Sequence, residues 1–313
     1  MDVRFRPLTA FGVGLVFALA APHAQDAART RIVLLGTGTP NATPDRWGPA
    51  TAIVVGDTPY LVDAGVGVVR RAAAARAKGV EALRASNLRH LFLTHLHSDH
   101  TLGYPDVIFS GWTLERDVPL EVYGPPGVDA MTRHLIAAYR EDIDIRLGGG
   151  EPANPNGWKV NVHEIAPGPV FKDDRVTVEA FAVPHGAWTH ALGFKFTTPD
   201  GVVVLSGDTG PFDGLAEIAK GADVLVHEAY ATAGWEKREP AWQKYHAAYH
   251  TSGRKVGEIA TRAGVATVVL THQLVWSATE QQLIAEVRST FAGRIISGQD
   301  LDVFDLRDLA RRQ

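Results

Sequence analysis

The sequence predicts an α/β fold, a four-layer αββα sandwich in which two mixed β-sheets pack face to face and helices cover both outer surfaces. Short apolar segments of strand length alternate with amphipathic segments of helical period, and this pattern runs through both halves of the chain. In both halves, polar residues follow the predicted strands at their C-terminal ends, where such folds place their sites. A length of 313 residues, 45% hydrophobic and 21% charged, suits one large soluble domain.

The first half supplies strands at residues 31–36, 51–55, 60–62 and 88–94. These segments are short and apolar, as buried strands are. An Ala- and Arg-rich segment at 68–78 and the segment 128–139 predict helices. A further helix is expected to begin near Asp99, whose carboxylate suits a helix N-terminus. Residues 148–158 are rich in Gly, Pro and Asn and predict a loop.

The second half repeats the arrangement. It supplies strands at residues 176–181, 192–197, 202–206, 224–227 and 267–271, and helices at 252–263 and 279–290. Strand runs with helices between them favour mixed sheets covered by helices. The sequence has no low-complexity segment, coiled-coil heptad or short-period repeat.

Residues 1–24 predict an export signal, which leaves residues 25–313 as a single folded domain. A positively charged start precedes an apolar run at residues 8–20, and Ala20 and Ala24 offer cleavage points. A membrane anchor is the alternative, but the run is shorter than the roughly 20 residues that span a bilayer. We therefore expect a periplasmic or secreted protein with no membrane segment after cleavage.

The net charge and the cysteine content restrict which partners and which metal ligands the chain can have. The net charge is -4, so the long-range attraction that recruits nucleic-acid phosphates is not visible, and no nucleic-acid partner is expected. The sequence contains no cysteine, which excludes disulfides and thiolate metal ligands. Every metal ligand must therefore be a histidine or a carboxylate.

A dense group of such side chains directly follows the predicted strand 88–94. It comprises His95, His97, Asp99 and His100. In an extended segment the first two histidines point the same way, whereas the last two residues lie past the turn and face a second position. Imidazole and carboxylate suit zinc and neighbouring transition metals, so the segment predicts half of a site for two divalent cations. A surface histidine cluster is the alternative.

This segment resembles the signature of the metallo-β-lactamase superfamily. The resemblance covers most of the chain after the signal and implies an αββα sandwich with one or two metal ions between its sheets. It also implies three later ligands, which match His185 after a strand, Asp208 as a carboxylate shared by both ions, and His272 at a strand end. Taken alone, each of the three has an ordinary alternative as a hydrogen-bonded histidine or a turn aspartate.

The resemblance divides the ligands between two ions. One ion takes His95, His97, His185 and Asp208, and the other takes Asp99, His100, Asp208 and His272. Two Zn²⁺ are expected, although Mn²⁺ or Fe suits the same ligands. A water bridging two such ions has a pKa near 7, so hydroxide is available for hydrolysis at neutral pH.

Two further residues have roles that the resemblance implies. Asp63, at the end of a predicted strand, matches an aspartate that orients a metal-binding histidine, with a turn aspartate as the alternative. His250 matches a histidine that protonates the leaving group in the ribonuclease Z-like branch, with a helix-capping histidine as the alternative. The predicted catalytic residues are therefore Asp99 and His250.

The segments 36–40 and 227–229 resemble the branch that contains ribonuclease Z and arylsulfatase-like enzymes. True β-lactamases fit less well, since one class needs a cysteine ligand and another lacks the shared aspartate. Transfer-RNA processing members carry a long RNA-gripping arm between the third histidine and that aspartate. Here only 23 residues separate His185 from Asp208. Together with the export signal and the acidic charge, this gap argues against RNA processing.

The segments 111–116, 119–127 and 138–142 resemble the arylsulfatase-type members. Arg116 and Arg140 are candidates to bind an anionic group. Aromatic residues predicted to line the substrate pocket are Trp112, Trp188, Tyr245 and Trp276, with Trp235, Trp242 and His246 as further candidates. For each tryptophan, core packing or a dimer contact is the alternative.

The sequence therefore predicts an exported dinuclear zinc hydrolase that acts on a small ester, an aryl sulfate or a phosphodiester. The alternatives are a ribonuclease Z-like phosphodiesterase or nuclease, a lactonase, or a hydrolytic dehalogenase of an aromatic substrate. A non-catalytic metal-binding module would lack a ligand, and this sequence has the full set. Related proteins often pair, so a homodimer is also expected.

Overall fold

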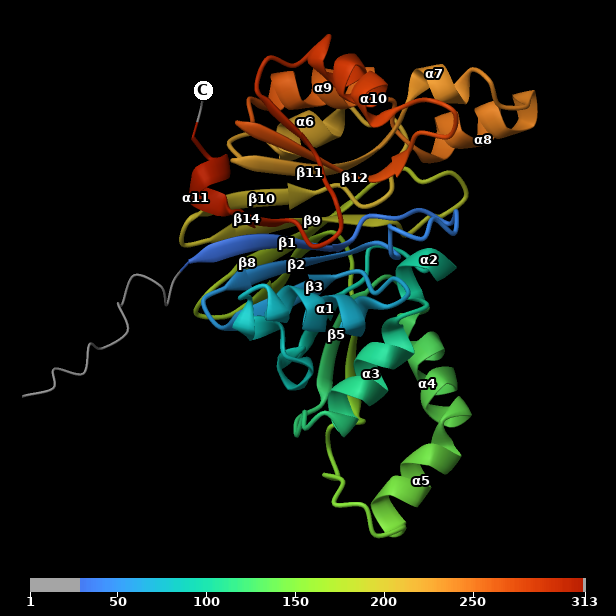
Figure 1. Cartoon of the computed structure of the whole chain (residues 1–313), viewed down its shortest axis with the longest axis vertical. Helices are drawn as coiled ribbons and strands as arrows, with labels where there is room; N and C mark the ends of the chain where they lie inside the picture. Colours follow the sequence, from blue (N-terminus) through green and yellow to red (C-terminus); the bar gives the residue numbers. More distant parts are fainter. Residues whose placement is uncertain (1–28, 312–313) are drawn as a thin grey trace, which may run out of the picture.

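The computed structural model describes residues 29–311 and has two mixed sheets of seven strands each (Figure 1). The predicted export signal at 1–24 lies outside the described residues. The first sheet has the order β14-β1-β2-β3-β4-β5-β6, and the second β13-β12-β11-β10-β9-β8-β7. In each sheet one side is antiparallel and the other parallel. The predicted four-layer αββα fold is confirmed.

The first sheet consists of β1 (Thr30–Gly36), β2 (Ala50–Val55), β3 (Thr58–Val62), β4 (His90–Phe92), β5 (Leu120–Gly124), β6 (Val160–Glu164) and β14 (Val303–Asp305). Its helices are α1 (Val68–Ala77), α2 (Ser98–Thr101), α3 (Tyr104–Thr113), α4 (Val128–Ala138) and α5 (Arg140–Gly148). The strand β14 comes from the C-terminal end of the chain and pairs antiparallel with β1. This pairing ties the two halves of the chain together.

The second sheet consists of β7 (Gly168–Lys172), β8 (Thr177–Ala182), β9 (Leu192–Thr198), β10 (Gly201–Leu205), β11 (Val224–Tyr230), β12 (Thr267–Leu274) and β13 (Arg294–Ser297). The helices of this half are α6 (Gly214–Ile218), α7 (Thr232–Trp235), α8 (Pro240–Tyr249), α9 (Gly253–Ala263), α10 (Glu280–Arg288) and α11 (Leu306–Leu309). Figure 1 shows α6, α9 and α10 above this sheet and α1 and α3 below the other. Among residues 29–311, no helix combines the length and apolar composition that a membrane crossing requires.

Three buried apolar clusters correspond to the three contacts between the four layers. The cluster between the sheets includes Ile32, Phe92 and Phe194. A second cluster joins the first sheet to α1 and α3, and a third joins the second sheet to α6, α9 and α10. The alternation of Ile32 and Leu34 toward one cluster with Val33 toward another is the period expected of a strand packed on both faces.

The helix α9 illustrates how the sequence sets an element next to the site. Its buried residues Val256, Ile259, Ala260 and Ala263 follow the helical period and face the second sheet. The Ser252 side chain accepts a hydrogen bond from the Lys255 N–H at its start, and Gly264, in the left-handed region, ends it. This cap fixes the backbone immediately after His250 and Thr251.

Several elements differ from the prediction. The strand predicted at 88–94 is β4, which spans only three residues, so His95 and His97 lie on a loop beyond the strand, whereas Asp99 and His100 lie in α2, the helix expected to begin near Asp99. Not predicted from the sequence were the strand β5, the four edge strands β6, β7, β13 and β14, and the helices α3, α5, α6, α7, α8 and α11. The strands β6 and β7 have many exposed residues, and α5 has only Ile143 buried, which leaves little apolar pattern to detect.

Candidate metal centre and active site

The side chains predicted as metal ligands all lie at one edge of the sandwich, near the ends of buried strands; Asp99 and His100 lie in the short helix α2. His95 and His97 follow β4, and His185 follows β8. Asp208 follows β10, and His272 lies within β12 near its end. All of the predicted ligands except His97 and Asp99, which are half-buried, are buried. The fold therefore brings together residues that are up to 177 positions apart in the sequence, between His95 and His272.

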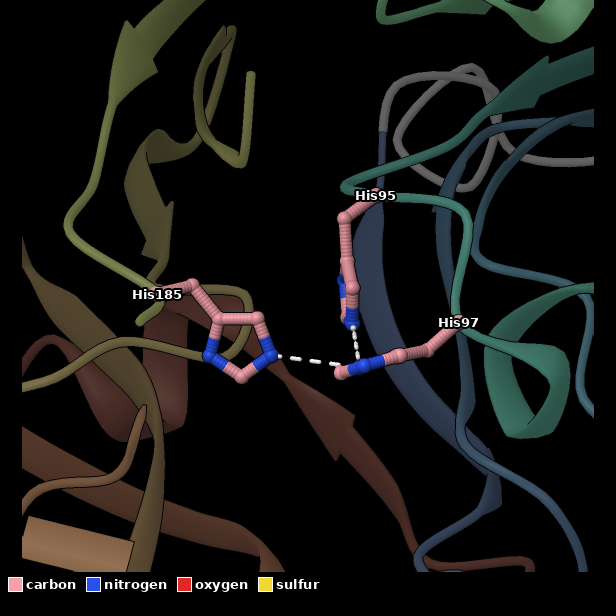
Figure 2. A group of neighbouring side chains, drawn as sticks. All are labelled: His95, His97 and His185. Atoms are coloured by element: carbon pink, nitrogen blue, oxygen red, sulfur yellow. Dashed lines mark hydrogen bonds between the residues drawn. The ribbon is translucent and has the colours of Figure 1, made fainter. Parts of the chain in front are cut away.

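The first group has three imidazoles that point toward one another (Figure 2). His97 Nδ1 lies 2.9 Å from His95 Nε2 and 3.2 Å from His185 Nε2. Burial lowers the pKa of His185 to about 4 and that of His95 well below its ordinary value, so both rings are neutral near pH 7. Three ring nitrogens around one point suit a divalent cation, since one proton cannot serve all three.

The second group joins two histidines and two carboxylates. His272 Nε2 lies 3.2 Å from Asp99 Oδ2 and 3.5 Å from Asp208 Oδ2. His100 Nε2 lies 3.4 Å from Asp208 Oδ2 and has no hydrogen bond of normal geometry. Because a ligand atom of Asp208 lies within 4.8 Å of those of His95 and His100, the carboxylate stands between the two groups. This is the position of a shared ligand.

The two buried groups are consistent with a site for two metal ions. Their nitrogens and carboxylate oxygens converge, and so many acceptors gathered in a buried place call for cations as partners. The donor set is oxygen and imidazole nitrogen, which zinc, manganese and iron all accept, so it does not fix the metal. The division of ligands between the two ions remains a prediction.

Neighbouring groups orient the ligands through their second ring nitrogens. Asp63 Oδ2 lies 2.8 Å from His100 Nδ1, and Asp63 Oδ1 accepts a hydrogen bond from the Thr94 N–H at 2.8 Å. His185 Nδ1 lies 2.8 Å from the Tyr249 carbonyl oxygen and donates to it. Each contact fixes the proton on Nδ1 and leaves Nε2 free to bind a cation. Asp63 thus occupies the orienting position that the sequence predicted.

The backbone is distorted at two of these residues. His272 has φ +45° and is the extra residue where the pairing of β11 with β12 shifts register. Asp63 has φ +63°. Such conformations cost energy for residues other than glycine and persist where surrounding contacts hold them. A bulge at a strand end turns the side chain out of the alternating pattern, and here it directs His272 toward Asp99 and Asp208.

His250 adjoins the second group and is paired with a buried glutamate. Its Nδ1 lies 3.2 Å from Glu228 Oε2, and Glu228 Oε1 accepts a hydrogen bond from the Thr251 N–H at 2.7 Å. Burial raises the pKa of Glu228 and lowers that of His250 to about 4. The contact occupies Nδ1, so Nε2 is the nitrogen left for a substrate. Glu228 was not among the predicted site residues, although a glutamate within an apolar strand is a signal of a functional role.

A cavity of about 400 Å³ opens beside the second group. It is lined by Pro40, Asn41, His97, Ser98, Asp99, Asp208, Arg238, Trp242, Tyr245, His246, His250, His272, Leu274 and Trp276. The predicted pocket residues Tyr245 and Trp276 are among them. Trp188 lies instead against the three-histidine group, with its Nε1 2.6 Å from His97 Nε2. A larger cavity, of about 740 Å³, lies at the C-terminal ends of α9 and α10 and has none of the predicted site residues in its lining.

The predictions that Arg116 binds an anionic group and that Trp112 lines the substrate pocket are wrong. Arg116 is fully buried, and its guanidinium donates hydrogen bonds to the carbonyls of Leu88, Val107, Ile108 and Gly157. Trp112 lies on the buried face of α3, where its Nε1 donates to the Asn154 carbonyl. Both residues hold the fold together, because burying so many polar groups requires partners for each of them.

Two of the further candidates also lie away from the cavity. Arg140 is exposed and pairs with Asp144 one turn along α5. Trp235 donates from its Nε1 to the Gln243 carbonyl and stabilises the turn before α8. Arg238 also lines the cavity, although the sequence did not predict it as a pocket residue. Its aromatic partner Trp276 is 38 residues away, so no local pattern marks the pair.

Comparisons with known proteins agree with this geometry. The profile of the family described as the beta-lactamase superfamily domain matches residues 58–273. A ribonuclease Z of Mycobacterium bovis is 36% identical over 276 residues, which cover 86% of this chain and 96% of that protein. A ribonuclease Z of Mycobacterium avium is also 36% identical, over 280 residues, with the same coverage of each chain.

Solved structures show the same fold. The metallo-beta-lactamase fold protein YhfI from Bacillus subtilis has a TM-score of 0.68 at 18% identity, covering 88% of this chain and 99% of that one. The short form of human tRNase Z has a TM-score of 0.66 at 20% identity, with the same coverage. The expected class, a metal-dependent hydrolase, is confirmed. The chain belongs to the metallo-β-lactamase superfamily and, within it, to the ribonuclease Z branch.

Proposed function

We propose that this protein is a metal-dependent phosphodiesterase that cleaves RNA, as the name of its relatives indicates for them. The similarity to a ribonuclease Z extends over 96% of that protein. The observation that carries the proposal is the pair His250–Glu228 at the edge of the metal centre. A ribose alkoxide is a poor leaving group that needs a proton, whereas a phenolate leaves more readily without one. A buried histidine with a carboxylate behind it therefore suits a phosphodiester of ribose better than an aryl ester.

The residues of the site have separate roles in the proposed hydrolysis. Cations held by the two groups would supply Lewis acidity, which activates water and neutralises charge on the phosphate. Asp63 and the Tyr249 carbonyl hold the ligand rings in place, and burial excludes competing solvent. As the bond from phosphorus to the leaving oxygen breaks, His250 Nε2 donates a proton to that oxygen. Glu228 orients the ring through Nδ1, and a proton shared between Glu228 and Nδ1 keeps the ring neutral when Nε2 gives up its own proton.

The aryl sulfate preference loses its support. It rested partly on Arg116 and Trp112, which are buried in the core, and the family comparison points to ribonuclease Z. The short segment between His185 and Asp208 does not separate the chain from those relatives. The alignment has 276 positions and covers 86% of this 313-residue chain and 96% of the relative. Nearly every residue of the relative therefore pairs with a residue of this chain, so the relative has no long inserted arm either.

The test is a direct comparison of scissile bonds. The metal-loaded protein is assayed with bis(p-nitrophenyl) phosphate, p-nitrophenyl sulfate, a lactone, a chlorinated aromatic compound and an RNA with a 3′ extension. Hydrolysis of the phosphodiester and cleavage of the RNA, with little turnover of the rest, support the proposal. Faster hydrolysis of the sulfate than of either phosphodiester would overturn it.

Export and pairing are separate proposals. If residues 1–24 direct export, the protein isolated from the periplasm or medium begins after Ala20 or Ala24, which N-terminal sequencing measures. If the protein pairs, light scattering gives twice the mass of one chain. A full-length protein in the cytoplasm would contradict the first proposal, and the mass of a single chain would contradict the second.

A further inference from the structure

Arg238 lies in the wall of the cavity between two tryptophans. Its guanidinium carbon is 5.5 Å from the ring centroid of Trp242, on α8, and 5.4 Å from that of Trp276, after β12. Both distances are typical of cation–π contacts. The two rings hold the guanidinium in place and leave its N–H groups available to a further partner.

The hydrogen-bonding capacity of Arg238 is not used up within residues 29–311. No carboxylate of this part of the chain lies within 4.0 Å of its guanidinium nitrogens, and its buried Nε has no hydrogen-bond partner. Arg116, by contrast, binds four carbonyls. A partly buried guanidinium without an anion is costly, and such a group is well placed to bind a phosphate in a bidentate manner.

His246 supports the same conclusion independently. It lines the same cavity, is only 7% exposed, and neither of its ring nitrogens has a hydrogen-bond partner within the described chain. Its ring lies 4.6 Å from that of Trp276 and 5.6 Å from that of Trp242. An imidazole always carries at least one N–H donor, and a buried donor calls for an acceptor. Arg238 and His246 thus offer donors to one region of the cavity.

The position of His246 indicates which part of a substrate would lie there. It precedes His250 by four residues at the end of α8, so the two side chains are neighbours, with ring centroids 5.8 Å apart. If His250 protonates the leaving oxygen, the neighbouring donors face the leaving side of the scissile bond. In an RNA, the group on that side is a nucleoside that carries its own 5′-phosphate.

We propose, on the basis of the proposed function, that Arg238, His246 and Trp242 form a subsite for the nucleotide on the leaving side of the cleaved bond. Arg238 and His246 bind its 5′-phosphate. Trp242, 49% exposed, offers aromatic surface against which its base packs. The subsite selects substrates that carry a second phosphate one nucleotide before the one that is hydrolysed.

The experiment compares the dinucleotides pUpA and UpA, which differ only in the 5′-phosphate. Hydrolysis of the first gives uridine 5′-phosphate and adenosine 5′-phosphate, and hydrolysis of the second gives uridine and adenosine 5′-phosphate. We expect the unmodified protein to favour pUpA by about tenfold in kcat/KM, mainly through KM, because hydrogen bonds to charged groups contribute that much. In Arg238→Gln the ratio falls close to one. Arg238→Lys keeps the positive charge but loses the planar guanidinium that binds a phosphate through two hydrogen bonds, so its ratio of kcat/KM for pUpA over UpA is intermediate.

Lys237→Gln is the matched control, since it removes an adjacent exposed positive charge that does not line the cavity. Its ratio should equal that of the unmodified protein. If Arg238→Gln keeps the preference, or if the control loses it equally, the subsite is wrong and only general charge attraction acts.

A failure of the proposed function is distinguishable from a failure of the subsite. If neither dinucleotide is hydrolysed, the Asp208→Asn protein is titrated with each of them and the change in tryptophan fluorescence is followed. About tenfold tighter binding of pUpA that disappears in the Asp208→Asn, Arg238→Gln protein supports the subsite without any turnover. Equal binding of the two dinucleotides overturns it.

Discussion

The metal centre and the wall of the cavity beside it are built in different ways. The metal ligands lie near the ends of buried strands, and Asp63, Thr94 and the Tyr249 carbonyl hold the second ring nitrogens of three of the histidines in place. The wall is formed by Arg238 and by aromatic residues of α8 and of the loop after β12, which contact one another through ring faces. Hydrogen bonds to a rigid sheet edge fix geometry closely, whereas stacked rings tolerate movement. The centre therefore suits the chemical step and the wall suits recognition.

If that division is correct, changes at the centre lower kcat and changes at the wall raise KM. The largest effect is expected for Asp208→Asn, which keeps the size of the side chain but removes the charge between the two groups. We expect kcat on bis(p-nitrophenyl) phosphate to fall about 10³-fold, because a cation contributes several kcal/mol to such a reaction. Metal analysis should show a loss of bound metal. Asp213→Asn, an exposed aspartate in the same half, serves as the control, and an equal loss there would contradict the assignment.

The next effect is expected for His250→Gln. General acid catalysis contributes about 10²–10⁴-fold, so cleavage of UpA should slow by that factor in kcat. Hydrolysis of bis(p-nitrophenyl) phosphate should slow much less, since nitrophenolate leaves without a proton. Steady-state rates on both substrates measure the difference. Equal losses on the two would show that His250 binds metal or holds the loop rather than donating a proton.

Arg116→Met changes an arginine that belongs neither to the metal centre nor to the cavity wall, so it tests whether this arginine acts only on stability. The change leaves four buried carbonyls without their donor, and we expect the free energy of unfolding to fall by about 3 kcal/mol. KM for UpA should stay the same below the unfolding temperature. Urea denaturation and steady-state kinetics measure the two quantities. A raised KM with unchanged stability would return Arg116 to the substrate pocket.

The smallest effect is expected for Trp242→Ala. The ring is 49% exposed, so its removal should cost little stability, but it removes the aromatic surface proposed to pack against a base. Loss of one such contact raises KM for UpA by about tenfold with little change in kcat. Tyr139→Ala, which removes an exposed ring remote from the cavity, is the control. A fall in kcat without a change in KM would place Trp242 with the centre instead of the wall.

The same contrast explains what the sequence can predict. Four metal-binding residues lie within six positions after a strand, so the first half of the centre is a local pattern, and the resemblance supplied the other ligands. The bulge at His272 is a tertiary feature with no local signature. The wall is assembled from segments 38 residues apart, so its aromatic residues and His246 could be proposed only one by one, and Arg238 was not proposed.

The misplacement of Trp112 has a physical reason that was present in the sequence. Tyr104, Ile108 and Trp112 recur at the helical spacing of four residues, which marks the buried face of α3. Without that helix, the tryptophan and Arg116 were interpreted as pocket residues on a loop. A tryptophan near an arginine in the sequence does not by itself predict a pocket. Arg116 and Arg238 both have one nearby, but the fold buries the first in the core and places the second in the cavity wall.

The measurement that tests the account most directly is a titration of metal-free protein with Zn²⁺, followed by phosphodiesterase activity and by the amount of bound metal at each step. Two groups of ligands sharing Asp208 predict that two equivalents bind and that activity appears mainly with the second. In Asp208→Asn the second equivalent should bind weakly and activity should stay low. Full activity with one bound equivalent, or an Asp208→Asn protein that binds two and retains its activity, would contradict a dinuclear centre built around this carboxylate.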